Sequence, residues 1–146
     1  MSVKTICATP LCLYQCSPSK INRISKTDWQ ITASEDISTK LSPSELACVF
    51  QYISSNLGQK ISLSNLADAV NRSPYHFTRL FKQATGFTPY QYVIQCRIER
   101  AKQLLRETDL AIALIAQQVG FSSHGSFTKA FRKHTNLSPK VYRRQR

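Results

Sequence analysis

The sequence predicts an all-α fold with two helix-turn-helix subdomains joined by a long linker helix, about seven helices in all. Apolar residues recur at helical spacing through most of residues 41–146. The stretch FTRLFKQATGFTP, residues 77–89, returns as FTKAFRKHTNLSP, residues 127–139. A long helical pattern lies between the two copies. Together these observations predict a duplicated helical motif on a rigid connector.

Residues 1–40 form a predicted N-terminal arm, disordered or loosely ordered, ahead of a helical domain at residues 41–146. The arm lacks sustained periodicity and mixes Cys, Ser, Thr, Pro and Lys. Such a composition does not supply an apolar core. No acidic residue precedes Asp28, which leaves a transit peptide open as a minor alternative.

The first predicted unit, residues 43–88, begins with a helix that Ser42 caps and Gly58 ends. Two short helices follow, joined by a tight turn at residues 71–74. The apolar positions expected to face the core are Leu46, Val49, Phe50, Ile53, Leu63, Leu66, Ala67, Val70, Phe77, Leu80 and Phe81.

The linker helix is predicted at residues 89–107 and the second unit at residues 108–146, with Thr108 and Asp109 as candidate caps. Ile115 and Val119 repeat Leu66 and Val70 at an offset of 49. One residue inserted in the second turn makes the offset 50 from Phe77 onward. The repeat therefore covers both helices and the turn of each unit.

The charge of the chain favours a polyanionic partner. Twenty basic and eight acidic residues give +12, and seven basic residues but no acidic one follow Asp109. An excess of this size favours nucleic acid as the partner. No apolar run approaches the roughly 20 residues of a membrane span, so no membrane partner is expected.

Five cysteines, an odd number with no secretory stretch before them, indicate a reduced, cytoplasmic protein. The sequence shows no phosphate loop and no paired metal-ligand motif, so it predicts no catalytic residue, no metal and no cofactor. A thiol and zinc alkyl acceptor of the DNA-repair type, using Cys7, Cys12, Cys16 and Cys48, remains an alternative, although their spacing departs from the CxxC pairs of compact zinc sites.

Residues 43–146 closely resemble the tandem helix-turn-helix DNA-binding domain of the AraC/XylS family of bacterial transcription regulators. The motifs that carry the resemblance are ISLSNLADAV, SPYHFTRLFKQATGFTPYQYV, RIERAKQLL and IAQQVGFSSHGSFTKAFRKHTNLSPKVYRR. The resemblance implies two recognition helices in the major groove of double-stranded DNA, action as an activator or repressor at promoters, and contact with RNA polymerase. A short, single-domain member or a truncated form of a longer regulator fits the chain.

The linker length agrees with this geometry. A helix over residues 89–107 rises roughly 28 Å at 1.5 Å per residue, close to the roughly 34 Å of one duplex turn. Two readers separated by about one turn can enter successive major grooves. We therefore expect one monomer to bind where other helix-turn-helix proteins use two chains.

In the first unit the positions that match the family's base-contacting ones are Tyr75, Thr78 and Arg79. Arg79 can bond guanine O6 and N7 in a bidentate way, and Tyr75 and Thr78 can touch a thymine methyl. In the second unit the matching positions are His124, Thr128 and Lys129. Candidates for contact with the phosphates are Ser73, Lys82, Gln83, Ser122, Ser126, Arg132 and Lys133.

The second unit departs from the family pattern at two positions, which weakens its expected DNA contacts. Gly125 stands where a polar side chain is usual, which removes a contact and costs up to about 1 kcal/mol of helix propensity. Asn136 replaces the usual glycine, which is tolerable because Asn also adopts the left-handed cap conformation. A DNA-binding half that acts as a passive competitor, or that chiefly engages RNA polymerase, remains an alternative function.

Overall fold

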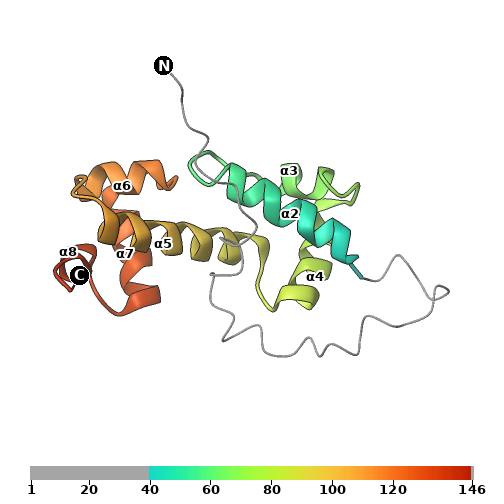
Figure 1. The fold of residues 1–146 in the computed structure, drawn as a ribbon. Helices are drawn as coiled ribbons and strands as arrows, with labels where there is room; N and C mark the ends of the chain where they lie inside the picture. The colour runs from blue at the N-terminus through green and yellow to red at the C-terminus, as the bar shows by residue number, and fades with distance from the viewer. Residues whose placement is uncertain (1–39, 146) are drawn as a thin grey trace, which may run out of the picture. The chain divides into compact units, whose positions relative to one another are not determined.

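The computed structural model describes residues 40–145, and the predicted N-terminal arm lies outside them. Within this range the chain is all-α, as predicted, with seven helices and no strand (Figure 1). The helices are α2 (Pro43–Ser55), α3 (Leu63–Asp68), α4 (Pro74–Thr85), α5 (Pro89–Glu107), α6 (Ile112–Gln118), α7 (His124–Thr135) and α8 (Pro139–Arg143).

The described chain divides into two compact units. The first holds residues 40–55 and 62–89, with α2, α3 and α4. The second holds residues 56–61 and 90–145, with nearly all of α5 and with α6, α7 and α8. The segment after α2 therefore belongs to the second unit, and the chain returns to the first at Ser62.

The core of the first unit is aromatic. Phe77 and Phe81 of α4 are fully buried, with ring centroids 5.5 Å apart, and Phe50 of α2 meets Phe81 edge to face at 6.1 Å. The predicted core positions Val49, Ile53, Leu66, Ala67, Val70 and Leu80 are buried with them. Each large apolar side chain buried in this way contributes about 1.5–3 kcal/mol relative to exposure.

An ion pair between Glu45 and Arg72 connects α2 to the turn between α3 and α4 in the first unit. Ser42 and Glu45 form a reciprocal cap at the start of α2: Glu45 Oε2 accepts from the Ser42 N–H at 2.7 Å, and Ser42 Oγ accepts from the Glu45 N–H at 3.2 Å. The other carboxylate oxygen, Oε1, accepts from Arg72 Nε and Nη2 at 3.4 and 3.2 Å. Because Arg72 lies between α3 and α4, the carboxylate ties the start of α2 to the turn.

The pKa of Glu45 reflects these contacts. Burial raises the pKa of its carboxyl, but the hydrogen bonds from Ser42 and the charge and hydrogen bonds of Arg72 together bring it below its usual range. The charged form is therefore the one that the folded unit prefers.

The second unit has a core of the same kind. Eight buried residues form it: Ile98, Ala101, Leu105, Ile115, Ala116, Val119, Phe127 and Phe131. A run of rings crosses it, since Phe127 lies 5.4 Å from Phe121 and 5.6 Å from Phe131, and Phe131 lies 5.4 Å from Tyr142. Tyr142 is further covered by the Arg106 guanidinium, 5.6 Å from the ring centroid.

The sequence repeat is also a repeat of hydrogen bonds. In the first turn Arg72 N–H donates to the Ala67 carbonyl at 3.0 Å, and in the second Phe121 N–H donates to the Ala116 carbonyl at 2.9 Å. At the helix ends, Thr85 Oγ1 donates to the Phe81 carbonyl at 2.8 Å, as Thr135 Oγ1 does to Phe131. The two units therefore share their backbone geometry.

Asparagine and glycine exchange places between the units. The turn residue with positive φ is Asn71 (52°) in the first unit and Gly120 (88°) in the second. The C-cap residue with positive φ is Gly86 (79°) after α4 in the first unit and Asn136 (60°) after α7 in the second. The prediction that Asn136 adopts the left-handed cap is confirmed.

Among these four residues with positive φ, Gly120 has neighbours so close that they leave no room for a side chain. A Cβ there would stand 2.3 Å from the Leu57 carbonyl oxygen and 2.8 Å from the Arg97 guanidinium. Arg97, on α5, donates to the carbonyls of Leu57 and Gln59 at 3.1 and 2.7 Å, and lies 5.9 Å from the Phe121 ring centroid. Burial lowers the pKa of Arg97, an effect partly offset by Tyr90.

The N-cap residue of α6 is Ala111, which has no side chain that can cap, and the helix begins at Ile112. The Thr108 hydroxyl donates to the Leu104 carbonyl at 2.7 Å, at the end of α5. In the second unit Arg143 Nη2 of α8 donates to the Leu110 carbonyl at 2.5 Å, which connects α8 to the segment before α6.

Candidate nucleic-acid interface

Two helices with matching starts, α4 and α7, carry the candidate residues. Ser73 caps α4 by accepting from the His76 N–H at 3.3 Å, and Pro74 occupies the first turn, where its missing N–H costs nothing. Ser123 caps α7 by accepting from the Ser126 N–H at 3.1 Å. In both helices the phenylalanines face the core, which fixes which side chains face outward.

The outward face of α4 presents an aromatic ring and basic groups. Tyr75 is 84% exposed, and Arg79, Lys82 and Gln83 are exposed as well. Thr78 is half-buried and donates its hydroxyl hydrogen to the Pro74 carbonyl at 2.8 Å. This leaves Thr78 with acceptor lone pairs and a methyl group for an outside contact.

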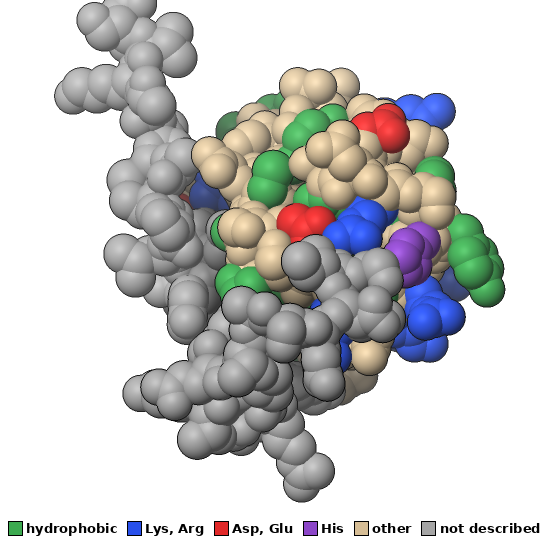
Figure 2. Space-filling model, turned by 90° about the vertical axis from the view of Figure 1, so that its right-hand side faces the viewer, with side chains coloured by type: hydrophobic (Ala, Val, Ile, Leu, Met, Phe, Trp, Pro, Cys, Tyr) green, Lys and Arg blue, Asp and Glu red, His purple; other side chains and the backbone are tan. Residues whose placement is uncertain are grey.

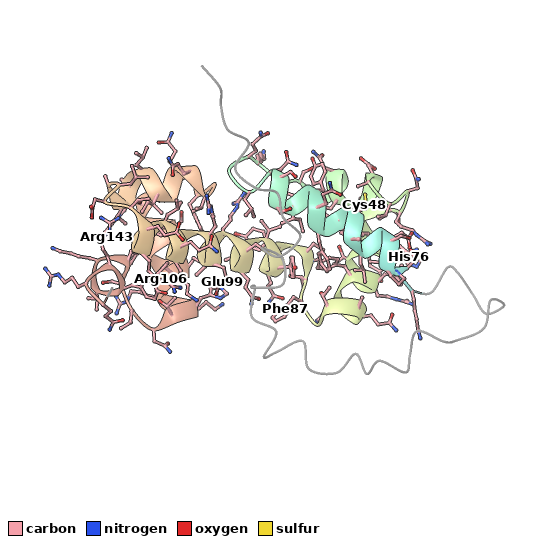
Figure 3. All side chains as sticks on the ribbon, in the orientation of Figure 1. Cys48, His76, Phe87, Glu99, Arg106 and Arg143 are labelled. Atoms are coloured by element: carbon pink, nitrogen blue, oxygen red, sulfur yellow. The ribbon has the colours of Figure 1, made fainter. Side chains whose placement is uncertain are left out.

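The surface view agrees with this composition. Figure 2 looks onto the first unit, which holds α2, α3 and α4 in Figure 1, and shows Lys and Arg side chains beside a histidine and an exposed hydrophobic group, with acidic groups on the same face. Figure 3 labels His76 in this unit, on α4, where it is half-buried. Acidic groups are absent from α4 itself.

The outward face of α7 is basic, and its second residue is a glycine, Gly125. His124, Lys129, Arg132 and Lys133 are exposed, Thr128 is half-buried, and no acidic residue occurs in the helix. A Cβ at Gly125 would meet nothing within 4 Å. A shallow, open depression lies here, lined by His124, Gly125, Thr128, Lys129 and Arg132.

Three predicted phosphate contacts are serines, and two of them form hydrogen bonds at a helix start. Ser73 is the N-cap of α4. Ser126 donates its hydroxyl hydrogen to the Ser123 carbonyl at 2.9 Å, and the two serine hydroxyls lie 3.0 Å apart. Ser122 is exposed in the turn before α7, at the inserted residue of the repeat. Ser73 and Ser126 therefore already have a structural role in orienting their helices.

His134, at the end of α7, is one of the two histidines that we did not assign a base contact. Burial and the charge of Lys133 lower its pKa, and Glu99 of α5, labelled in Figure 3, partly offsets them. The neutral form is thus favoured, which matches a side chain that adds little charge to the surface.

Reasoning from sequence alone missed the residues that hold the two turns. Arg72 with Glu45 does so in the first unit, and Arg97 with Gly120 does so in the second. The signals were weak: an arginine in a turn, a glutamate three residues after a cap, and a glycine at a break are common. Only the packing shows what each one contacts.

Residues 40–145 contain no cluster of candidate metal ligands. No group of three or more His, Cys, Asp or Glu residues that could hold a metal ion occurs there. Cys48 of α2, labelled in Figure 3, is exposed and its thiol points to the Ala69 carbonyl at 3.8 Å. Cys7, Cys12 and Cys16 lie outside the described residues. In the same part of the chain no helix is long and apolar enough to cross a membrane.

Comparison with known proteins then identifies the family. A family model described as a helix-turn-helix domain matches residues 66–145, more than half of the chain. The chain belongs to the AraC/XylS family of DNA-binding proteins.

Similar relatives in the AraC/XylS family include regulators. The chain is 38% identical over 97 residues to the probable transcriptional regulator LumQ of Photobacterium leiognathi. This match covers 66% of this chain and 39% of LumQ. It is also 38% identical over 95 residues to the bifunctional transcriptional activator/DNA repair enzyme AdaA of Bacillus subtilis, covering 65% of this chain and 45% of AdaA. The chain thus spans less than half the length of these relatives.

A solved structure of the same type contains DNA. The chain resembles the DNA-binding domain of AdpA, a global transcriptional factor, in complex with a target DNA, with a TM-score of 0.66 and 28% identity. The match covers 71% of this chain and 93% of the AdpA chain. The AraC/XylS fold predicted from the sequence is therefore the fold of the described chain.

Proposed function

We propose that this protein is a sequence-specific, double-stranded DNA-binding transcription regulator of the bacterial cytoplasm that reads two successive major grooves as a monomer. One observation carries the proposal: α4 and α7 are held by the same turn and exit hydrogen bonds, and each presents an exposed basic face without an acidic residue. Two similar helices, each positioned by the same hydrogen bonds, suit a DNA site that consists of two half-sites.

The base-reading role falls to three positions in each helix. In α4 they are Tyr75, Thr78 and Arg79, and in α7 His124, Thr128 and Lys129. Arg79 is exposed near the middle of its helix, and the fork of its guanidinium suits the two acceptors of guanine. Lys129, at the same place in α7, offers a point charge and so supports less discrimination.

Exposed cations in the later half of each helix suit the phosphates. Lys82 on α4, and Arg132 and Lys133 on α7, fill this role, because recognition helices direct their early residues to bases and their later ones to the backbone. Gln83 adds a neutral donor beside Lys82. Ser73, Ser122 and Ser126 lie at the helix starts, where the backbone N–H groups also suit an anion.

Selection of bound sequences from a random duplex pool tests the proposal. We expect a selected site with two conserved segments about one helical turn apart, bound by one chain as measured by analytical ultracentrifugation of the complex. The affinity should fall steeply between low and high salt as phosphate contacts release counterions. Equal binding to selected and scrambled duplexes would refute sequence-specific binding, and two chains per site would refute binding as a monomer.

Its effect on transcription needs a separate assay. We propose that the protein contacts RNA polymerase and activates, whereas a passive competitor would occupy sites and only block them. A reconstituted transcription reaction on the selected site distinguishes these, because activation raises the transcript yield and passive occupancy lowers it.

We propose no enzymatic activity. The name of AdaA joins regulation to DNA repair, which is the reason to test the thiol alternative directly. Zinc content of the purified chain decides it: about one zinc per chain, lost when Cys12 and Cys16 are replaced, would favour an alkyl acceptor of that kind.

A further inference from the structure

The two recognition helices differ strongly at one aligned position. Phe77 of α4 corresponds to Phe127 of α7, so Tyr75 corresponds to Gly125. Tyr75 is 84% exposed, whereas a Cβ added at Gly125 would have nothing within 4 Å. One helix therefore projects an aromatic ring where the other leaves open space.

This open space is part of the depression on the outward face of α7. Its lining residues, given above, recur at helical spacing and share one side of the helix. Gly125 supplies backbone only. Thr128 is half-buried with its Oγ1 atom fully buried, so the surface it exposes is chiefly carbon. The floor of the depression is therefore apolar.

The rim of the depression is basic. Lys129 and Arg132 are exposed on it, and His124 lies at its start. A matching ligand must bring a small apolar group flanked by anionic or acceptor groups. In the major groove of DNA the C5-methyl group of thymine is such a group, with phosphates and base acceptors on either side.

We propose that the α7 depression receives the C5-methyl group of a pyrimidine, so that the second unit selects thymine through its methyl group. The inference rests on the proposed DNA-binding function and deepens it. In the first unit the aligned position carries the exposed Tyr75 ring, so we expect a methyl group there to touch a projecting ring and not to enter a recess.

Replacing each thymine of the selected duplex in turn by deoxyuridine tests this, because the change removes the methyl group and keeps the base-pairing edge. We expect one position in the second half-site where the affinity falls about three- to fivefold, as burial of one methyl group predicts. With cytosine at that position, 5-methylation should strengthen binding by a similar factor.

Variants locate the effect. Gly125→Gln fills the depression without a clash, since the position is open, and should bring the thymine-to-deoxyuridine affinity ratio close to one. Thr128→Ser removes the methyl group of the floor and should reduce the ratio. Tyr75→Ala, the matched control in the first unit, should leave the ratio at that thymine unchanged.

The outcomes separate this inference from the proposed function. Tolerance of deoxyuridine throughout the second half-site, or a second half-site without thymine, overturns methyl recognition while specific binding stands. A ratio unaffected by Gly125→Gln overturns the assignment to the α7 depression. No preference of the wild type for the selected over a scrambled duplex refutes sequence-specific binding, and methyl recognition with it.

Discussion

Arg79 and Lys129 hold the same place on two equivalent helices but differ in chemistry. Both are exposed, and neither forms an ion pair among the described residues. Arginine offers a planar fork to two acceptors, whereas lysine offers one charge that many acceptors satisfy. At the scale of single residues, we therefore expect the first unit to discriminate better between base pairs.

We predict that Arg79→Ala weakens binding to the selected site by about 1–3 kcal/mol and relaxes preference at one base pair, as loss of a bidentate contact does. Lys82→Ala should weaken binding to selected and random DNA alike, and Lys129→Ala should have a smaller sequence effect than Arg79→Ala. Titrations at fixed salt on the selected duplex and its single-base variants measure this. Equal losses on every sequence for Arg79→Ala would mean that it holds phosphate.

Glu45 links the stability of the first unit to pH. Its folded pKa lies below the ordinary value of 4.5, so its stabilisation is fully present above that pH and is lost as the pH falls through the folded pKa. We predict that Glu45→Gln costs about 1 kcal/mol at pH 7, as removal of a charged hydrogen-bond acceptor does, and costs less below pH 4. Thermal melts of both proteins across this range measure it. A pH-independent difference would contradict the assignment.

At the scale of elements, the repeat conserves backbone geometry while exchanging the residues that achieve it. Asn71 and Gly120 adopt the same left-handed turn, yet only Gly120 is enclosed by a carbonyl and a guanidinium. Identical local conformations therefore tolerate substitution differently, because the constraint at Gly120 comes from its neighbours.

A reciprocal pair of substitutions tests this difference. Gly120→Asn should destabilise the protein by about 2 kcal/mol or more, because the side chain meets backbone and displaces Arg97. Asn71→Gly should change stability by no more than about 0.5 kcal/mol, since the position is exposed. Chemical denaturation of each variant gives both values. Similar costs would show that the turn conformation, and not the enclosure, limits both sites.

Much of the fold could be predicted because helical periodicity, serine and proline caps and aromatic spacing are local signals. The ranges of α5 and of the helices around both turns follow from them. The Arg97 contacts could not be predicted, since Arg97 and the Leu57 carbonyl lie 40 positions apart in the sequence. No sequence pattern marked Ala111 as the N-cap residue of α6. For the candidate interface, the pattern predicts which side chains face outward, and the roles assigned to those side chains stay predictions.

At the scale of the whole molecule, the net charge of +12 is unevenly shared along the chain. Residues 41–146 carry 15 basic and 5 acidic residues, whereas residues 1–40 carry 5 and 3. The attraction to a polyanion therefore resides mainly in the helical part, and the segment before it adds little to it.

We accordingly predict that deletion of residues 1–40 leaves the melting temperature and the DNA affinity nearly unchanged. The cut falls before Leu41, which is buried, so it removes no side chain of the described core. A thermal melt and a gel-shift titration of the shortened chain measure both properties. Loss of a cooperative melt, or a more than tenfold loss of affinity, would show that this segment takes part in folding or binding.

The path of the chain limits how such regulators can be recombined. It passes through the first unit, enters the second at residues 56–61, returns, and enters the second again at Tyr90. A single crossover between two related genes at residue 89 would therefore give a hybrid in which Arg97 of one parent meets the Leu57 and Gln59 carbonyls of the other. Exchange of the second unit therefore keeps the Arg97 contacts within one parent only when residues 56–61 are transferred together with residues 90–145.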